Sequence, residues 1–252
     1  MKKKLVLKIG SSTLTAGTNR ISYAKIENIA RQIVALKNEW EIILVSSGAI
    51  ATAKQFVEIR GYDKQVDSKQ AMAAIGQPKL MRIYDEIFSS FGLHVAQCLM
   101  TYRDFEDEAA KANTRHTILK LLENDYVPII NENDTVAIEE IVLGDNDKLS
   151  TLVAVIIEAD LLVLGSDIDG LHKENPHLNK EAEHIKEVTD LQRVISFIRE
   201  KESDLGTGGM TTKLEAAQIC QENNIEMWIV NGGRHNFLID ALEDKIPFTK
   251  FK

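Results

Sequence analysis

The hydrophobic pattern of the chain alternates between short apolar runs and longer amphipathic stretches. Runs rich in Val, Ile and Leu lie at residues 4–9, 41–46, 94–100, 127–130, 160–165 and 227–231. Between them, apolar side chains recur at helical spacing, as in Ile26, Ile29 and Ile33 or Leu80, Ile83 and Ile87. Strands that alternate with helices require crossover connections, so the pattern predicts an α/β fold on a mostly parallel sheet.

The same pattern gives little sign of a domain boundary. The chain has 252 residues, of which 44% are hydrophobic and only 4 are proline, and it shows no Gly/Ser-rich linker and no internal repeat. We therefore predict one continuous domain over residues 1–252, divided near residue 160 into two halves, about 1–160 and 161–252. Residues 135–147 read as a hairpin over the sheet edge that delivers Asp145, Asn146 and Asp147 to the next helix.

Charge and cysteine content narrow the classes of function. The net charge of −8 and the pI of about 5.4 argue against broad binding to nucleic acid or anionic membranes, so any phosphate site must be local. Cys98 and Cys220 lie far apart and form no C-x-x-C pair, which indicates neither a disulfide framework nor a zinc site. The apolar run near the N-terminus is interrupted by Lys8 and is too short for a signal peptide, and no run reaches the length of a membrane span. A cytoplasmic, soluble protein is predicted.

The run GTGGMTTK at residues 206–213 is the first candidate for chemistry. Its three glycines allow backbone N–H groups to converge on an anion, and we predict that it leads into a helix beginning KLEAAQIC. Thr211 and Thr212 would offer hydroxyls at the helix entry, and Lys213 would lie in the first turn as a mobile cation. The order of residues matches neither the P-loop nor the G-x-G-x-x-G motif. A flexible surface loop with an accidental lysine would give the same letters.

Two further candidates follow predicted strands, where ligands of open α/β sheets gather. Lys8 precedes a turn at Gly10 and could lie against phosphate oxygens, although a strand-end lysine can also extend into solvent. Ser46 and Ser47 precede a helix at Ala49 and could bind a carboxylate or phosphate, although plain N-capping by serine explains the same residues.

Polar clusters after the later strands are also candidates. NEND (131–134) and GDND (144–147) could bind an ammonium group or orient lysines, whereas Asx-rich turns are the simpler explanation and calcium lacks its EF-hand spacing. The turn at residues 165–171 could contact a nucleotide or simply connect two elements. The six histidines form no metal-binding pattern and no G-x-S-x-G elbow occurs, so metal-histidine and hydrolase chemistry have little support.

Taken in order, KIGSS, SSGAI, SKQAMAAIGQPKLM, NENDTVA, GDNDKLS, SDIDGL and GTGGMTTK resemble the amino acid kinase family, and within it the branch that phosphorylates the side chain of L-glutamate. The resemblance covers residues 4–232 and rests on seven motifs in sequence. It implies a three-layer α/β/α sandwich with the acceptor amino acid in the N-terminal half and ATP in the C-terminal half.

The resemblance also implies roles for individual residues. Lys8 and Lys213 would neutralise the transferring phosphoryl group, and Asp147 would hold both lysines in place. The glutamate site would comprise Ser47, Asp134 and Asn146. Gly10, Lys8, Ser166 and Asp167 would contact the nucleotide, together with Thr207, Gly208, Gly209, Met210, Thr211, Thr212 and Lys213. Mg²⁺ would be carried on the ATP phosphates, with no protein ligand assigned.

The family relationship further implies a setting for the reaction. A glutamyl phosphate reductase would use the product in proline biosynthesis, and the chain would form a homo-oligomer, a dimer or tetramer. Ser166 stands where relatives often carry threonine, and the C-terminal PUA domain of many relatives is expected to be absent. Two alternatives stay open: a sibling kinase acting on another acid, such as aspartate or N-acetylglutamate, and a nucleotide-binding sensor that has lost catalysis.

Overall fold

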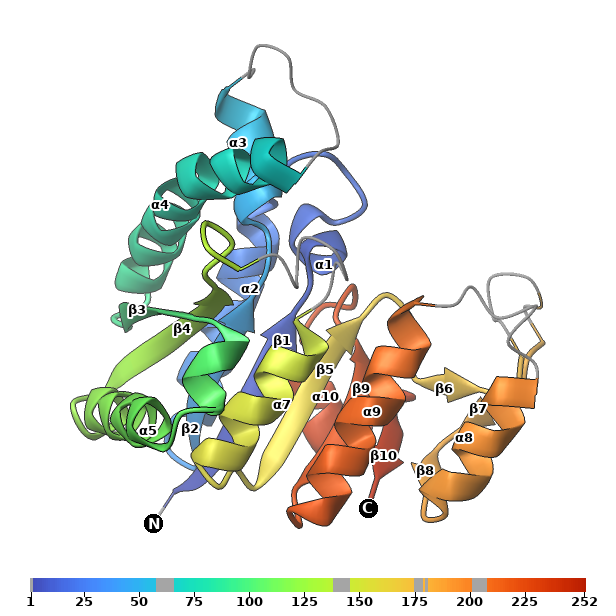
Figure 1. Ribbon diagram of the computed structural model, residues 1–252. Helices are drawn as coiled ribbons and strands as arrows, with labels where there is room; N and C mark the ends of the chain where they lie inside the picture. The colour runs from blue at the N-terminus through green and yellow to red at the C-terminus, as the bar shows by residue number, and fades with distance from the viewer. Residues whose placement is uncertain (1, 58–65, 138–145, 175–178, 180, 201–207) are drawn as a thin grey trace.

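The computed structural model describes residues 2–57, 66–137, 146–174, 179, 181–200 and 208–252 (Figure 1). Most of these residues build one mainly parallel sheet with helices on both faces. The predicted three-layer α/β/α sandwich is thus confirmed. Most of the predicted hairpin, including Asp145, lies outside the described residues, as does Thr207.

Eight described strands form the main sheet in the order β3-β4-β2-β1-β5-β9-β10-β8. Their bounds are β1 (Lys3–Ile9), β2 (Trp40–Ser46), β3 (His94–Met100), β4 (Tyr126–Glu132), β5 (Leu161–Ser166), β8 (Glu187–Val188), β9 (Glu226–Asn231) and β10 (Thr249–Phe251). All neighbouring pairs are parallel except β9 with β10. The six strands predicted from apolar runs are all present. Five of the runs are largely buried, whereas β3 lies at one end of the strand order and only its Met100 is buried.

The described helices are α1 (Ser11–Thr15), α2 (Tyr23–Leu36), α3 (Ala49–Phe56), α4 (Val66–Ser90), the 3₁₀ helix η1 (Tyr102–Phe105), α5 (Glu108–Glu123), α7 (Asp147–Ile156), α8 (Leu191–Glu200), α9 (Gly208–Glu222) and α10 (Phe237–Leu242). A separate two-stranded hairpin joins β6 (Leu171–His172) to β7 (His184–Ile185). Within the part of the chain that the structure describes, none of the helices combines the length and apolar character needed to cross a membrane.

Two apolar cores, one on each face of the sheet, hold the layers together. On one face, side chains of α1, α2, α4 and α10 pack against alternate residues of β1, namely Leu5, Leu7 and Ile9. On the other face, Val6 packs with side chains of α5, α7, α8 and α9, which lie in front of the sheet in Figure 1. Because residues two apart on a strand share a face, Lys8 lies on the same side as Val6, toward α7 and α9.

The parallel arrangement gathers the polar motifs at one edge. Lys8 lies near the end of β1, and Ser46, Glu132 and Ser166 end β2, β4 and β5. In a sheet of parallel strands these carboxyl ends meet along one edge, which is where open α/β sheets bind ligands. The structure therefore places most of the candidate motifs at the carboxyl ends of strands, although Ser46, Asn131 and Ser166 are still part of their strands.

Close approach of the strands at this edge requires glycine. A Cβ atom at Gly165 would lie 2.9 Å from the carbonyl oxygen of Lys8. Any larger residue there would push β5 away from β1. The sequence Gly165-Ser166 thus allows β5 to deliver its polar turn directly beside the end of β1.

Candidate active site

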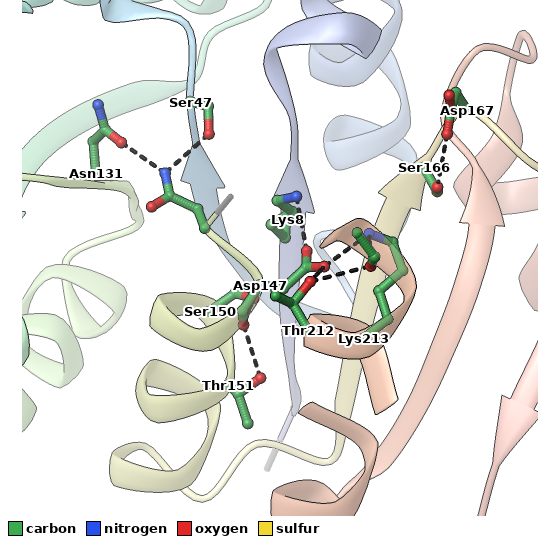
Figure 2. Close-up of polar contacts among 12 residues, drawn as sticks. Lys8, Ser47, Asn131, Asp147, Ser150, Thr151, Ser166, Asp167, Thr212 and Lys213 are labelled. Carbon is green, nitrogen blue, oxygen red and sulfur yellow. Dashed lines mark hydrogen bonds and ion pairs between the residues drawn. The ribbon is translucent and has the colours of Figure 1, made fainter. Parts of the chain in front are cut away.

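The centre of the candidate site is an ion cluster of two lysines and one aspartate. Asp147 begins α7, and its side chain is fully buried. One of its carboxylate oxygens, Oδ1, lies 2.7 Å from Lys8 Nζ, and the other, Oδ2, lies 2.8 Å from Lys213 Nζ (Figure 2). Thr212 Oγ1 donates to the same Oδ2 at 3.3 Å. Three distant segments of the chain, β1, α7 and α9, therefore meet on one carboxylate.

The cluster is both enclosed and cationic. The side chains of Lys8 and Lys213 are only 7% and 11% exposed. Two ammonium groups and one carboxylate leave a formal charge of +1, since 2 − 1 = 1. A fixed positive charge at the carboxyl edge of a parallel sheet attracts anionic ligands, and low exposure strengthens that attraction.

The start of α7 holds Asp147 in a defined position. The backbone carbonyl of Asp147 accepts hydrogen bonds from Ser150 Oγ at 2.7 Å and Thr151 Oγ1 at 2.8 Å. An acidic residue in the first turn also interacts favourably with the helix dipole. These contacts fix the backbone of Asp147, and the two lysines reach its carboxylate on longer side chains.

Helix α9 begins five residues earlier than the sequence analysis predicts. It starts at Gly208, so Lys213 lies in the second turn and not the first. Lys213 Nζ donates to the carbonyl of Gly209, one helical turn earlier, at 3.0 Å. Leu214 and Ala217 bury this helix against the sheet, and that packing outweighs the poor helix propensity of the glycine pair. The prediction of a loop up to Lys213 is therefore wrong.

Asn146, the residue before Asp147, points its side chain away from the two lysines. Asn146 is fully buried, and its Nδ2 donates to Ser47 Oγ at 3.0 Å and to Asn131 Oδ1 at 2.8 Å. Although Asn146 is the N-cap residue of α7, its side chain makes no capping hydrogen bond. Figure 2 shows Ser47 and Asn131 on one side of the start of α7, with Lys8, Thr212 and Lys213 on the other. Two consecutive residues thus belong to two adjoining groups of polar contacts.

Ser47 is not a helix cap. The N-cap of α3 is Gly48, with φ of 110°, and no side chain caps this helix. Ser47 instead donates its backbone N–H to the carbonyl of Ile9 at 3.1 Å, and its hydroxyl accepts from Asn146. The simpler explanation of the serine pair, plain N-capping, is therefore wrong.

Asp134 follows β4 and is 7% exposed. Burial first, and the neighbouring charge of Glu132 second, raise the pKa of this carboxyl to about 7. A carboxylate that is costly to ionise in the ligand-free protein gains a large stabilisation from an incoming cation. Perturbed acids of this kind are typical of ligand sites.

The remaining candidates lie at the opposite half of the edge. Gly10 precedes α1, and a Cβ there would lie 3.6 Å from Lys8 Nζ. Ser166 ends β5 and donates to the carboxylate of Asp167 at 3.2 Å. Met210, Thr211 and Thr212 lie within the first two turns of α9. No described contact tests their predicted roles toward a nucleotide.

The structure adds two features that the sequence analysis does not single out. The predicted site includes only Asp134 from the NEND cluster. In the structure Asn131, the first residue of that cluster, also contacts Asn146 directly. Beyond β5, Arg234 forms a two-pronged pair with Asp169, with both distances 2.8 Å, and lowers the pKa of that carboxyl. This pair ties the turn after β5 to the turn after β9.

A buried cluster with a net positive charge at the carboxyl edge of a three-layer α/β/α sheet is the arrangement expected of a protein that binds an anionic ligand. Comparison with known sequences identifies the protein family. Residues 3–231 match the Amino acid kinase family, and the chain belongs to that family.

Curated relatives agree with this assignment, and a solved structure shares the fold. The glutamate 5-kinase of Clostridium tetani is 42% identical over 251 residues, which cover 99% of this chain and 94% of the relative. The glutamate 5-kinase of Clostridium acetobutylicum is 44% identical over 250 residues, or 98% and 94% of the two chains. The carbamate kinase from Giardia lamblia bound to AMP-PNP superimposes with a TM-score of 0.69 at 14% identity, covering 99% of this chain and 98% of that one. At such low identity, the last likeness concerns the fold alone.

Proposed function

We propose that this chain transfers the γ-phosphoryl group of ATP to the side-chain carboxylate of L-glutamate. The observation that carries the proposal is its identity of 42% and 44% to two glutamate 5-kinases along nearly their whole length. The geometry of the Lys8–Asp147–Lys213 cluster supports it, because such a cluster suits the charge that develops in phosphoryl transfer.

The reaction needs positioning and charge stabilisation more than proton transfer. A free glutamate side chain has a pKa of about 4.3, so at neutral pH it is already an oxygen nucleophile. One of its oxygens attacks the γ-phosphorus, and the bond from that phosphorus to the β–γ bridging oxygen breaks, giving ADP and γ-glutamyl phosphate. No proton moves, and no general base is required.

Lys8 and Lys213 would stabilise this transfer. Their ammonium groups lie on the two oxygens of one buried carboxylate, so both are held at the same point of the edge. With the phosphates bound, both ammonium groups would face the phosphoryl oxygens while Asp147 keeps them in place. Removing one such fixed donor typically costs about a hundredfold or more in rate.

The acceptor would bind beside this cluster, in the N-terminal half at about residues 1–160. Ser47 and Asn146 lie on the side of α7 that faces β2 and β4. Asp134 supplies a carboxyl whose pKa is raised to about 7, so an incoming cation would favour its ionised form. Together these groups would bind the amino-acid end of glutamate and leave its side chain pointing toward the lysines.

The nucleotide would bind in the C-terminal half, at about residues 161–252. Gly10, Ser166 and Asp167 would contact it, together with residues 207–213 at the start of α9, whose N-terminal N–H groups and dipole favour phosphate. Ammonium groups cannot ligate a cation, so the cluster suits the phosphates and not Mg²⁺ itself. Among the described residues no group of three His, Cys, Asp or Glu side chains could hold a metal. Mg²⁺ commonly binds through substrate phosphates, so we propose that the phosphate oxygens of ATP hold it and that it neutralises part of their charge.

The proposed reaction also has a cellular setting. An acyl phosphate hydrolyses readily, so an enzyme that reduces it, a glutamyl phosphate reductase, would be the functional partner in proline biosynthesis. We place the chain in the cytoplasm, where ATP and glutamate are available and where free thiols such as Cys98 and Cys220 persist. We also propose a homo-oligomer, a dimer or tetramer, as in the family.

Coupled detection of ADP tests the function. The purified chain should release ADP only when glutamate, ATP and Mg²⁺ are all present, and hydroxylamine should trap the product as γ-glutamyl hydroxamate. Aspartate and N-acetylglutamate serve as matched alternative acceptors. Turnover with one of them and none with glutamate would reject the proposed substrate.

A further inference from the structure

A chain of side-chain amides leads from the sheet edge into the acceptor site. Asn146 Nδ2 donates to Asn131 Oδ1 at 2.8 Å, and Asn131 Nδ2 donates to Gln77 Oε1 at 3.0 Å. Gln77 Nε2 in turn donates to Gln97 Oε1 at 3.4 Å. Asn146, Asn131 and Gln77 are all buried. Every link runs in the same direction, with each NH₂ group donating outward, away from the cluster.

This direction determines which atom of Asn146 faces a ligand. An asparagine NH₂ group has two N–H donors, and those of Asn146 are used by Ser47 Oγ and Asn131 Oδ1. The carbonyl oxygen of Asn146 is buried and has no hydrogen-bond partner among the residues that the structure describes. Asn146 therefore presents an acceptor and not a donor. A buried acceptor without a partner suits the N–H groups of a ligand.

Gln77 is the residue that fixes this direction. It lies in α4 next to Gly76, where a Cβ would lie 1.8 Å from the carbonyl oxygen of Ala49 in α3. The glycine lets α4 pack directly on α3, and the next residue then reaches Asn131 on β4. With Gln77 Oε1 facing Asn131 Nδ2, the oxygen of Asn131 must face Asn146.

We propose that Gln77 is a positioning residue that, through Asn131, holds the carbonyl oxygen of Asn146 toward the ammonium group of the amino-acid substrate. The proposal rests on the proposed function and adds to it the basis for choosing an α-amino acid. A ligand without that ammonium group leaves the Asn146 oxygen buried and unpaired, which is the kind of penalty that rejects analogues strongly.

Two substitutions of Gln77 separate positioning from packing. Gln77→Leu removes the acceptor that Asn131 Nδ2 uses, whereas Gln77→Glu keeps an acceptor oxygen at the same place. Gln218→Leu is the matched control, because Gln218 lies exposed on α9 and bonds only to Glu222 of its own helix among the described contacts. If Gln77→Leu does not fold, Gln77→Met serves the same comparison with an unbranched chain.

The measurements are kcat, the KM values for glutamate and ATP, and the inhibition constant of glutarate, which has both carboxylates of glutamate but no ammonium group. Gln77→Leu should raise the KM for glutamate about tenfold, the loss of about one hydrogen bond. The kcat, the KM for ATP and the glutarate constant should change less than about twofold, as expected when the lost contact to the ammonium group is equally strong in the ground state and the transition state. Gln77→Glu should stay within about threefold of the unmodified protein, since the relay keeps its direction.

Three results would overturn the proposal. An unchanged KM for glutamate in Gln77→Leu removes the positioning role. Equal weakening of glutamate and glutarate shows that the ammonium group is not the target. A Gln77→Glu protein as impaired as Gln77→Leu means that Asn131 turns its oxygen toward Gln77, so the relay runs the other way. If the unmodified protein phosphorylates another amino acid, the proposed function fails, while the same KM comparison with that acid still tests the relay.

Discussion

Asp147 holds two buried lysines, and replacing it with asparagine removes the charge but keeps the size and shape of the side chain. Its oxygens lie 2.7 Å from Lys8 Nζ and 2.8 Å from Lys213 Nζ. The formal charge of the cluster rises from +1 to +2, because 2 − 1 becomes 2 − 0. Asp147→Asn therefore leaves two like charges facing each other with little access to water.

The size of the effect follows from the burial of the pair. At an effective dielectric constant of about 20, unit charges about 4 Å apart attract by about 4 kcal/mol. Removing one partner of a buried ion pair costs about 3–5 kcal/mol in measured cases. We expect the free energy of unfolding to fall by this amount, which for a domain of this size lowers Tm by about 6–20 °C. The value of kcat/KM should fall about a hundredfold or more, because both lysines lose their anchor.

A second substitution separates stability from catalysis. In the Asp147→Asn background, Lys213→Met returns the charge of the cluster to +1 and relieves the repulsion between the lysines. In thermal unfolding, we expect the double variant to regain part of the stability that Asp147→Asn loses. Its kcat/KM should not recover. As a control, Asp244→Asn removes the partner of Lys250 from a pair whose aspartate is 69% exposed. Its effect should be about 1 kcal/mol or less.

Two outcomes would refute this reasoning. If Asp147→Asn stays within about threefold of normal kcat/KM, the carboxylate does not position the catalytic lysines. If adding Lys213→Met lowers the stability of Asp147→Asn further, charge repulsion is not what destabilises the single variant.

Three other residues, Asp134, Gly76 and Gly10, give predictions. Because burial and the charge of Glu132 raise the pKa of Asp134 to about 7, the folded chain binds a proton there between about pH 4 and 7 that the unfolded chain lacks. The free energy of unfolding should therefore decline as pH rises through this window. Urea unfolding at pH 5 and pH 8 should show that Asp134→Asn flattens this decline. In the unmodified protein, the KM for glutamate should rise below pH 7. Gly76→Ala places a Cβ 1.8 Å from a backbone oxygen and should cost about 1–3 kcal/mol in chemical unfolding while raising the KM for glutamate. Gly10→Ala, whose Cβ lies an ordinary 3.6 Å from Lys8 Nζ, should leave the unfolding midpoint unchanged and raise the KM for ATP.

The strands were predictable because burial on both faces of a parallel sheet produces continuous apolar runs, as in β1 and β5. The start of α9 was not predictable from the sequence. The low helix propensity of glycine predicts a loop at residues 208–212, whereas packing of Leu214 against the sheet extends the helix. The local sequence shows the intrinsic helix propensity of each residue, but tertiary contacts decide where the helix begins.

The candidate site likewise has residues that the sequence predicts and residues that only the structure shows. Family motifs predict Lys8, Asp147 and Lys213, and the structure brings these distant residues together. No letter pattern shows which way an amide points, so the contribution of Gln77 and Asn131 emerges only from the three-dimensional hydrogen bonds. The nucleotide contacts of Ser166, Asp167 and residues 207–213 stay predictions.

The most direct test of the central claim is γ-glutamyl hydroxamate formation by the unmodified chain and by Lys213→Met, with ATP, Mg²⁺ and glutamate. We expect the unmodified chain to form the hydroxamate only with all three components, and Lys213→Met to form it about a hundredfold more slowly while remaining folded. Formation at near-normal rate by a folded Lys213→Met protein, or none by the unmodified chain, would contradict it.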